Sequence, residues 1–231
     1  MSRPRSTAAL LGLLIVVVGL AGCTRKNTPS EQLPAADGLL KAAAADMKQV
    51  KTVKFDIDAE GTVAGLALRG ADGVLVREGD AQGRAQVEQF GTLVELQFIV
   101  KGDKMYIKGP TGGYQELPLA LASNVYDPSA ILDPDRGVAK LLETATEGRT
   151  EAREQVNGVD AYRVTAKLDP LVVGTIVPGV TGDITGQLWI AAGQPRLLRT
   201  SFTVPGSGGS PGGKVTITLS DFDAPVTISA P

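Results

Sequence analysis

The chain has 231 residues, a formal net charge of −2 at pH 7, one cysteine and no histidine. A charge balance this close to neutral argues against nucleic acid as a partner. The lack of histidine removes the commonest general base and the commonest metal ligand, and a single cysteine excludes a disulfide framework within the chain.

The N-terminal segment has the layout of a bacterial secretory signal. Two arginines precede an apolar run that begins near Ala8 and ends in the four residues LAGC at 20–23. This is the bacterial lipobox, in which small residues permit cleavage between Gly22 and Cys23 and the Cys23 thiol accepts a diacylglyceryl group. The run is shorter than the roughly 20 residues that span a bilayer, so we favour this interpretation over a transmembrane helix. We therefore expect an anchor in the cell membrane on its extracytoplasmic, periplasm-like side.

The next residues predict a tether followed by a helix. Residues 24–37 are polar and contain two prolines, which indicates a flexible connection. Residues 38–50 are rich in alanine, place apolar residues near one face and follow Asp37, a candidate N-cap. The expected organisation is a signal peptide at 1–22, a lipidated N-terminus and tether at 23–37, and one folded domain at 38–231.

Most of the remaining chain alternates between apolar and polar residues, a pattern typical of half-buried strands. Turns are expected at 70–73 and 101–104, and the pair Asn157-Gly158 is a strong hairpin signal. The expected strands lie at 53–57, 66–68, 74–76, 84–90, 93–101, 105–108, 150–156, 159–168, 187–191, 197–204, 214–219 and 226–228. Short connections between consecutive strands predict an antiparallel meander in one α+β domain.

Two segments between these strands lack the alternation. Residues 109–135 show no period, and Asp135 is a candidate cap for a short helix that follows them. The apolar face of that helix holds Val138, Leu141 and Leu142. Residues 169–180 are apolar and fit either a short helix or a loop.

Candidate catalytic groups are few. Asp133 and Asp135 flank a proline and fit a turn and a helix cap better than a pair of catalytic carboxylates. Three acids at 56, 58 and 60 fit the solvated face of a strand better than a metal site. The aromatic residues that might stack on a sugar fit packing at the rim of the sheet better; they are Tyr106, Tyr114, Tyr126 and Trp189. We expect no enzymatic activity and no cofactor.

The apolar face of the predicted sheet allows two interpretations. The chain has only five phenylalanines and one tryptophan, so the inward side chains are mainly small and aliphatic. They fit a tightly packed core or a cavity of lipid size, and composition does not decide between the two.

A resemblance to a known family bears on this choice. The stretch VYDPSAILDPDRGVAKLL at 125–142 resembles a segment of the LppX/LprAFG family of mycobacterial lipoproteins. The similarity continues at 65–68 (GLAL), 104–107 (KMYI), 147–149 (EGR), 157–158 (NG), 188–190 (LWI) and 218–220 (TLS). It covers nearly the whole chain beyond Cys23 and is strongest to the branch whose members are paired with a major facilitator superfamily exporter.

The resemblance implies a fold and a function. The fold is a single, strongly bent antiparallel β half-barrel with helices on its concave face, which encloses an apolar cavity as in LolA and LolB. The function is carriage of triacylated lipids or glycolipids across the cell envelope, with bound acyl lipid as cargo, an exporter as a possible partner and a monomeric carrier. The alternative is a structural or adhesive surface lipoprotein with a filled core and no lipid cargo.

Strand alternation, the apolar helix face and the resemblance together give an expected cavity lining. The resemblance places Ala85 there, because Ala85 follows the turn at 81–84 that matches a turn of the family. The expected lining residues are Leu66, Leu68, Val74, Val76, Ala85, Val87, Leu96, Phe98, Val100, Ile131, Val138, Leu141 and Leu142.

Overall fold

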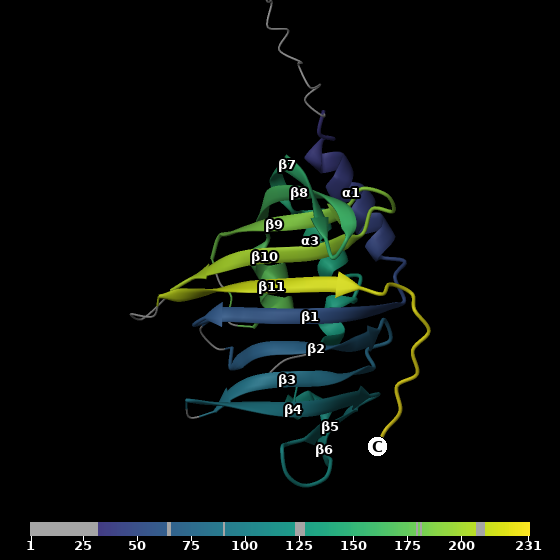
Figure 1. Cartoon of the computed structure of the whole chain (residues 1–231), viewed down its shortest axis with the longest axis vertical. Coiled ribbons are helices and arrows are strands. Elements are labelled where there is room, and N and C mark those ends of the chain that lie inside the picture. The colour runs from purple at the N-terminus through teal and green to yellow at the C-terminus, as the bar shows by residue number, and fades with distance from the viewer. Residues whose placement is uncertain are drawn as a thin grey trace, which may run out of the picture. The chain divides into compact units, whose positions relative to one another are not determined.

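One curved antiparallel sheet of eleven strands organises the structure, a computed structural model (Figure 1). The strands are β1 (Thr52–Gly61), β2 (Leu68–Val76), β3 (Ala81–Gln89), β4 (Thr92–Lys101), β5 (Lys104–Lys108), β6 (Gln115–Pro118), β7 (Thr146–Val156), β8 (Val159–Leu168), β9 (Ile184–Ala191), β10 (Leu197–Pro205) and β11 (Gly212–Ser220). The structure describes residues 32–63, 66–89, 91–122, 128–178, 180, 182–206 and 211–231. The expected signal peptide, Cys23 and Tyr126 therefore lie outside the described residues.

The sheet is made of two meanders that are joined by the first and last strands. Its spatial order is β6-β5-β4-β3-β2-β1-β11-β10-β9-β8-β7. The meander prediction is confirmed within each half, and the pairing of β1 with β11 was not predicted. Asn157 and Gly158 adopt φ values of 49° and 81° in the β7–β8 turn, as a type I′ hairpin requires.

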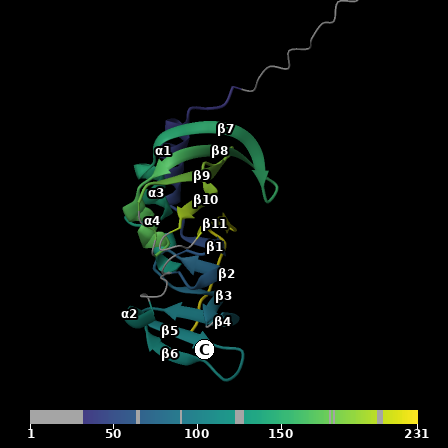
Figure 2. The same cartoon turned by 90° about the vertical axis from the view of Figure 1, so that its left-hand side faces the viewer.

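Helices lie against one face of this sheet, which we call the inner face (Figure 2). They are α1 (Ala36–Met47), α2 (Leu119–Ala122), α3 (Val138–Thr144), α4 (Pro170–Ile176) and a 3₁₀ helix, η1 (Pro128–Ile131). In Figures 1 and 2, α1, α3 and α4 lie beside the half of the sheet that contains β7–β11, and α2 lies near β5 and β6. The predicted class, a bent antiparallel α+β sheet with helices on one face, is confirmed. No helix among the described residues is long and apolar enough to cross a membrane.

The helix ends differ from the expected ones in two places. Helix α1 starts before Asp37, which lies in its first turn rather than at the N-cap, where its charge still favours the helix dipole. Helix α3 starts after Gly137 and is not capped by Asp135. The Asp133 carboxylate instead accepts hydrogen bonds from the Asp135 and Arg136 amides in the preceding turn. The segment at 169–180, for which the sequence fitted either a helix or a loop, begins as helix α4. The Asp169 side chain caps this helix by accepting a hydrogen bond from the Leu171 amide.

Three strand predictions were wrong for identifiable reasons. Residues 70–73 are not a turn but part of β2, where Gly73 lies opposite Gly83 and an added Cβ would stand 2.9 Å from the Gly83 Cα. Strand β6 was missed because all its residues are exposed, so it shows no alternation. Residues 226–228 form no strand, since β1 and β10 already pair with both edges of β11.

Alternation along each strand separates a packed inner face from a polar outer face. Phe55 and Ile57 of β1 are buried in one core cluster with Leu40 of α1 and Leu141 of α3. The three acids at 56, 58 and 60 are exposed on the outer face, as expected. The helices therefore stabilise the fold by covering apolar strand residues.

An arginine network ties the end of α1 to the segment after β11. The Arg196 Nε atom lies 2.7 Å from a carboxylate oxygen of Asp46, and its Nη2 atom lies 2.7 Å from one of Asp223. The guanidinium also lies over the Phe222 ring, 5.1 Å from its centroid. Hydrogen bonds from the Lys51 amide and from Arg196 hold the pKa of Asp223 below its ordinary value, against the effect of burial.

We predict that Arg196→Ala lowers the free energy of unfolding by about 2 kcal/mol at pH 7, because it breaks two charged hydrogen bonds of a largely buried side chain. The pKa of Asp223 is lowered in the folded protein. The contribution of the Asp223 carboxylate to the free energy of unfolding is therefore lost only as the pH falls through that lowered pKa. The difference from wild type should therefore shrink at acid pH. Urea unfolding at both pH values measures it.

The matched control is Lys104→Ala, which removes an exposed ion pair with Glu116. Exposed pairs contribute little, so this variant should unfold close to wild type. Equal stability of both variants would contradict a structural role for the arginine network.

Candidate functional site

The inner face is not equally covered along the sheet. Between β8 and β1 the inward side chains are buried, as at Val164, Leu188 and Ile217. On β3 and β4 the inward side chains Ala85 and Phe98 are only half-buried, although both pack against the core cluster. The core therefore continues at this end as an apolar surface that keeps contact with solvent.

Strand register brings the residues of this surface together. Ala85 lies opposite Ala71 on one side and Leu96 on the other. Gly83 lies opposite Phe98, which in turn lies opposite Ile107 of β5. Small residues on β2 and β3 therefore lie beside larger ones on β4 and β5 within this surface.

Most residues of the predicted lining lie on the inner side of the sheet or on the helices that cover it. Seven of them are buried in the core cluster: Leu66, Leu68, Val100, Ile131, Val138, Leu141 and Leu142. Four more are half-buried and lie against the core cluster or beside it: Ala85, Val87, Leu96 and Phe98. The structure therefore brings eleven of the thirteen predicted residues to one side of the sheet; that they contact lipid stays a prediction.

The placement of Val74 and Val76 was wrong. They lie opposite Lys54 and Thr52 of β1, on the outer face, because Leu75 between them is the residue that points inward and is fully buried. A strand cannot turn consecutive residues to one face. The short apolar run at 74–76 gave no alternation from which its phase could be read.

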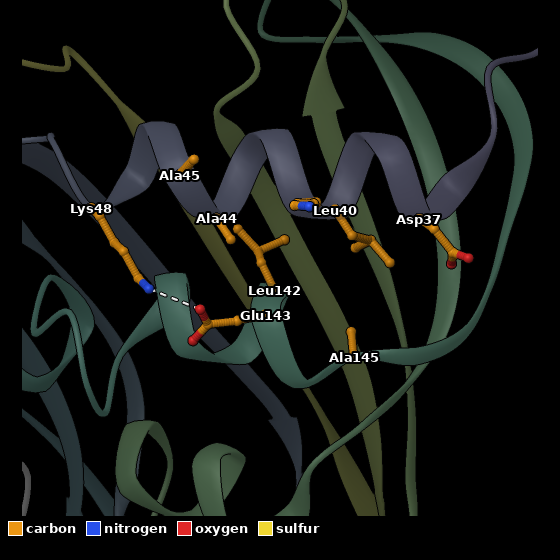
Figure 3. Close-up of a pocket in the computed structure, with 9 residues that line it drawn as sticks. Asp37, Leu40, Ala44, Ala45, Lys48, Leu142, Glu143 and Ala145 are labelled. Carbon is orange, nitrogen blue, oxygen red and sulfur yellow. Dashed lines mark hydrogen bonds and ion pairs between the residues drawn. The ribbon is translucent and has the colours of Figure 1, made fainter.

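A second candidate site is a groove of about 470 Å³ on the helices (Figure 3). It is lined by Asp37, Leu40, Lys41, Ala44, Ala45, Lys48, Leu142, Glu143 and Ala145. The Lys48 ammonium lies 2.9 Å from the Glu143 carboxylate across the groove, and hydrogen bonds from Lys48 and Lys140 lower the pKa of Glu143. The floor is the apolar contact of α1 with α3 and the rim is charged. Of its residues, the sequence pointed only to Asp37 as a helix cap and to Leu40 and Leu142 on apolar helix faces, none of them as part of a groove.

Nothing in the described part of the chain forms a catalytic arrangement from the candidate acids. Burial raises the pKa of Asp133, but hydrogen bonds from Arg136 and from the Asp135 amide outweigh this and leave it lowered. Within the described ranges, no three potential metal-binding side chains come together. Asp133 therefore has the turn-forming role expected of it, whereas Asp135 does not have the expected role of helix cap.

Two of the aromatic candidates, Trp189 and Tyr114, lie away from the inner face. Trp189 is buried in a small outer-face cluster, and its indole N–H donates to Glu154 at 3.3 Å, so packing is confirmed. Tyr114 is partly exposed beside β6, where Lys108 lies 5.8 Å from its ring centroid and its hydroxyl bonds Gln97 at 3.3 Å. Trp189 and Tyr114 therefore do not add an apolar surface to the one on β3 and β4.

Comparisons with known proteins agree with this architecture. The model of the LppX_LprAFG lipoprotein family matches residues 35–228. The lipoarabinomannan carrier protein LprG of Mycolicibacterium smegmatis is 30% identical, over 100% of this chain and 98% of its own. The crystal structure of LprF from Mycobacterium bovis matches with a TM-score of 0.73 at 27% identity, covering 85% of this chain and 96% of that one. The lipoprotein LppX of Mycobacterium tuberculosis shares the fold, with a TM-score of 0.64 at 19% identity over 85% of this chain and 99% of its own.

The assignment of faces predicts losses of stability of different size for the same substitution at two valines. Val100→Thr places a hydroxyl on the inner face at a fully buried position and should cost about 1–3 kcal/mol. Val74→Thr makes the same change on the outer face and should cost about 0.5 kcal/mol or less. Urea unfolding of both variants compares them directly, and equal losses would contradict the register described here.

Proposed function

The chain belongs to the LppX_LprAFG lipoprotein family, and from this we propose that it is a membrane-anchored lipid carrier that holds acyl chains against the inner face of its sheet. Membership confirms the resemblance seen in the sequence. Relatives that match along their whole length are named as carriers of lipoarabinomannan. A triacylated lipid or glycolipid is accordingly the proposed class of cargo, and its movement across the cell envelope is the proposed task.

The observation that carries the proposal is the half-buried apolar surface on β3 and β4. Ala85, Leu96 and Phe98 keep partial exposure although they adjoin a fully buried core. Burial of each methylene of an acyl chain contributes about 0.8 kcal/mol, so such a surface binds hydrocarbon in preference to water. An acyl chain placed there would extend the core of the protein.

The remaining parts of the proposal concern location and partners. A diacylglyceryl group on Cys23 would hold the carrier at the extracytoplasmic side of the membrane, and the polar residues after it would let the domain reach beyond the surface. We propose a monomer that acts without catalysis and exchanges cargo with the membrane or with an exporter of the major facilitator superfamily.

A structural lipoprotein with a filled core is the alternative function. It is favoured by the dense packing of the other half of the inner face, where Phe55, Leu188 and Ile217 are almost fully buried. The two functions differ in whether purified protein contains lipid.

The first prediction concerns the anchor. Cys23→Ala should abolish incorporation of radiolabelled palmitate, because the chain contains no other thiol. The variant should accumulate as an unlipidated precursor, and detergent partitioning compares it with wild type. Wild type treated with globomycin, which blocks the signal peptidase, is the control for an uncleaved precursor. Labelled palmitate on the Cys23→Ala protein would show that the lipobox interpretation is wrong.

The second prediction separates the two functions. Ala85→Trp places an indole at a position that keeps partial contact with solvent, so thermal unfolding should stay close to that of wild type. The ring should occupy volume that acyl chains need, so the lipid extracted from the purified protein should fall. Mass spectrometry of extracted lipid and melting curves on the same preparations measure both effects.

Gln86→Trp is the matched control, because residue 86 is the exposed outer-face neighbour in the same strand. It should change neither the melting temperature nor the lipid content. In a filled core, Ala85→Trp would instead cost about 1–3 kcal/mol through overpacking, and wild type would yield no lipid. That pair of results would reject the carrier in favour of the structural lipoprotein.

A further inference from the structure

The four strands at the open end of the sheet, β3 to β6, carry all of their charge on the outer face. Strand register and alternation fix the inward positions: odd numbers from 81 to 89 on β3, even numbers from 92 to 100 on β4, 105 and 107 on β5, and 115 and 117 on β6. None of these positions holds a charged residue. The arginine, glutamates and lysines of the four strands all alternate with them and face outward, as at Arg84, Glu95 and Lys108.

Polar side chains occur on these inward positions only at the rim. Gln89 and Thr92 are paired beside the β3–β4 connection, and Gln115 of the edge strand β6 lies opposite Ile107. All three polar side chains are exposed. The other inward positions of the four strands hold only glycine and apolar residues. We call Gln89, Thr92 and Gln115 the uncharged rim of the half-buried surface.

The two short helices at this end add no charge. Helix α2 contacts β5 and β6, and η1 contacts β2. Their sequences are LALA and PSAI, so neither contains an ionisable side chain. Among the described elements on the inner side of this end, the half-buried surface therefore has only uncharged neighbours.

The opposite end of the sheet shows that the fold tolerates charge on its inner side. Arg153 of β7 lies opposite Tyr162 of β8, and its guanidinium stands 5.9 Å from the centroid of that ring. Tyr162 in turn lies opposite Ile190, a residue of the core cluster. The lack of charge on the described inward positions of β3–β6 is therefore a property of that end rather than of the whole inner face.

A surface without charge discriminates between lipid head groups. A phosphate placed beside it gives up part of its hydration and meets no cation there, which is unfavourable. A hydroxyl, ester or sugar head group loses less, and glutamine and threonine offer it both hydrogen-bond donors and acceptors. Ligand sites commonly combine an apolar lining with a few polar groups that fix the orientation of the ligand. The half-buried surface and its uncharged rim have this arrangement.

We propose that the β3–β6 end selects acyl lipids with an uncharged head group, which holds its acyl chains on the half-buried surface and its head group at the uncharged rim. This rests on the carrier function proposed above and adds the residues that set its specificity. The cargo is then a neutral glycerolipid or a glycolipid without phosphate. Because a membrane-anchored carrier meets phospholipids in large excess, exclusion of their charged head groups keeps the surface free for cargo.

The test compares two lipids that differ only in a phosphate. The full chain, processed by a bacterial host and held in a nonionic detergent, is offered equal amounts of dipalmitoylglycerol and dipalmitoylphosphatidic acid. The protein is captured and washed, and the ratio of the two bound lipids is measured by mass spectrometry relative to their ratio in protein-free micelles. Wild type should favour dipalmitoylglycerol about three- to tenfold.

A lysine at the rim should weaken this preference. Gln115→Lys and Thr92→Lys each give the phosphate a cation at an exposed position, so each should lower the ratio about two- to fivefold. The effect should disappear at about 1 M salt, which screens exposed charges.

Two controls separate the position of the charge from its presence. Gln86→Lys adds the same charge at an exposed outward position of β3 and should keep the wild-type ratio. Gln115→Leu changes the rim without adding charge, and it removes a hydrogen bond from both lipids, so the preference should also remain. Melting curves check that each variant is folded.

The possible failures are distinguishable. Wild type that retains neither lipid would reject the carrier function itself. Wild type that retains both lipids in their micellar ratio would overturn the selection of uncharged head groups and leave the carrier intact. An unchanged ratio in both Gln115→Lys and Thr92→Lys would show that the head group does not lie at the rim. An equal drop in Gln86→Lys would mean attraction by the overall charge of the protein, which also overturns the proposal.

Discussion

The pairing of β1 with β11 is the contact on which the rest of the fold depends. It runs in register from Lys54 opposite Ser220 to Gly61 opposite Gly213, and it joins two meanders that would otherwise each end in an open edge. On its inner side Phe55 and Ile57 meet Leu219 and Ile217, so one apolar face crosses the junction without a break. Loop closure between the two ends of the chain costs entropy before this contact forms, which predicts that the junction forms late in folding.

Short-range signals could be read from the sequence, and the contacts that depend on distant partners could not. The hairpin at Asn157-Gly158 was predictable because two residues fix its turn geometry. The β1–β11 pairing was not predictable, since the sequence of neither strand indicates which distant strand it pairs with. Gly73 reads as a turn residue in the sequence, but it serves the close approach of β2 to β3, which only the presence of Gly83 explains.

The same limit applies to the candidate site. Alternation along one long strand placed Leu96, Phe98 and Val100 on the correct face, because the polar residues Glu95 and Gln97 alternate with them and fix the phase. It failed at 74–76, where all three residues are apolar and only burial of Leu75 reveals which one points inward. The groove between α1 and α3 escaped prediction, since it is created by the relative placement of two helices that lie far apart in the chain.

The uneven cover of the inner face separates the part of the sheet that stabilises the fold from the part that stays partly exposed. In the half beside α1, α3 and α4, the inward side chains of β9, β10 and β11 are almost completely buried, and hydrophobic burial there stabilises the domain. The half formed by β3 and β4 can then keep Ala85 and Leu96 partly exposed without loss of the fold. Under the proposed carrier function, an acyl chain would lie at this open end, where burial of the inward side chains is incomplete.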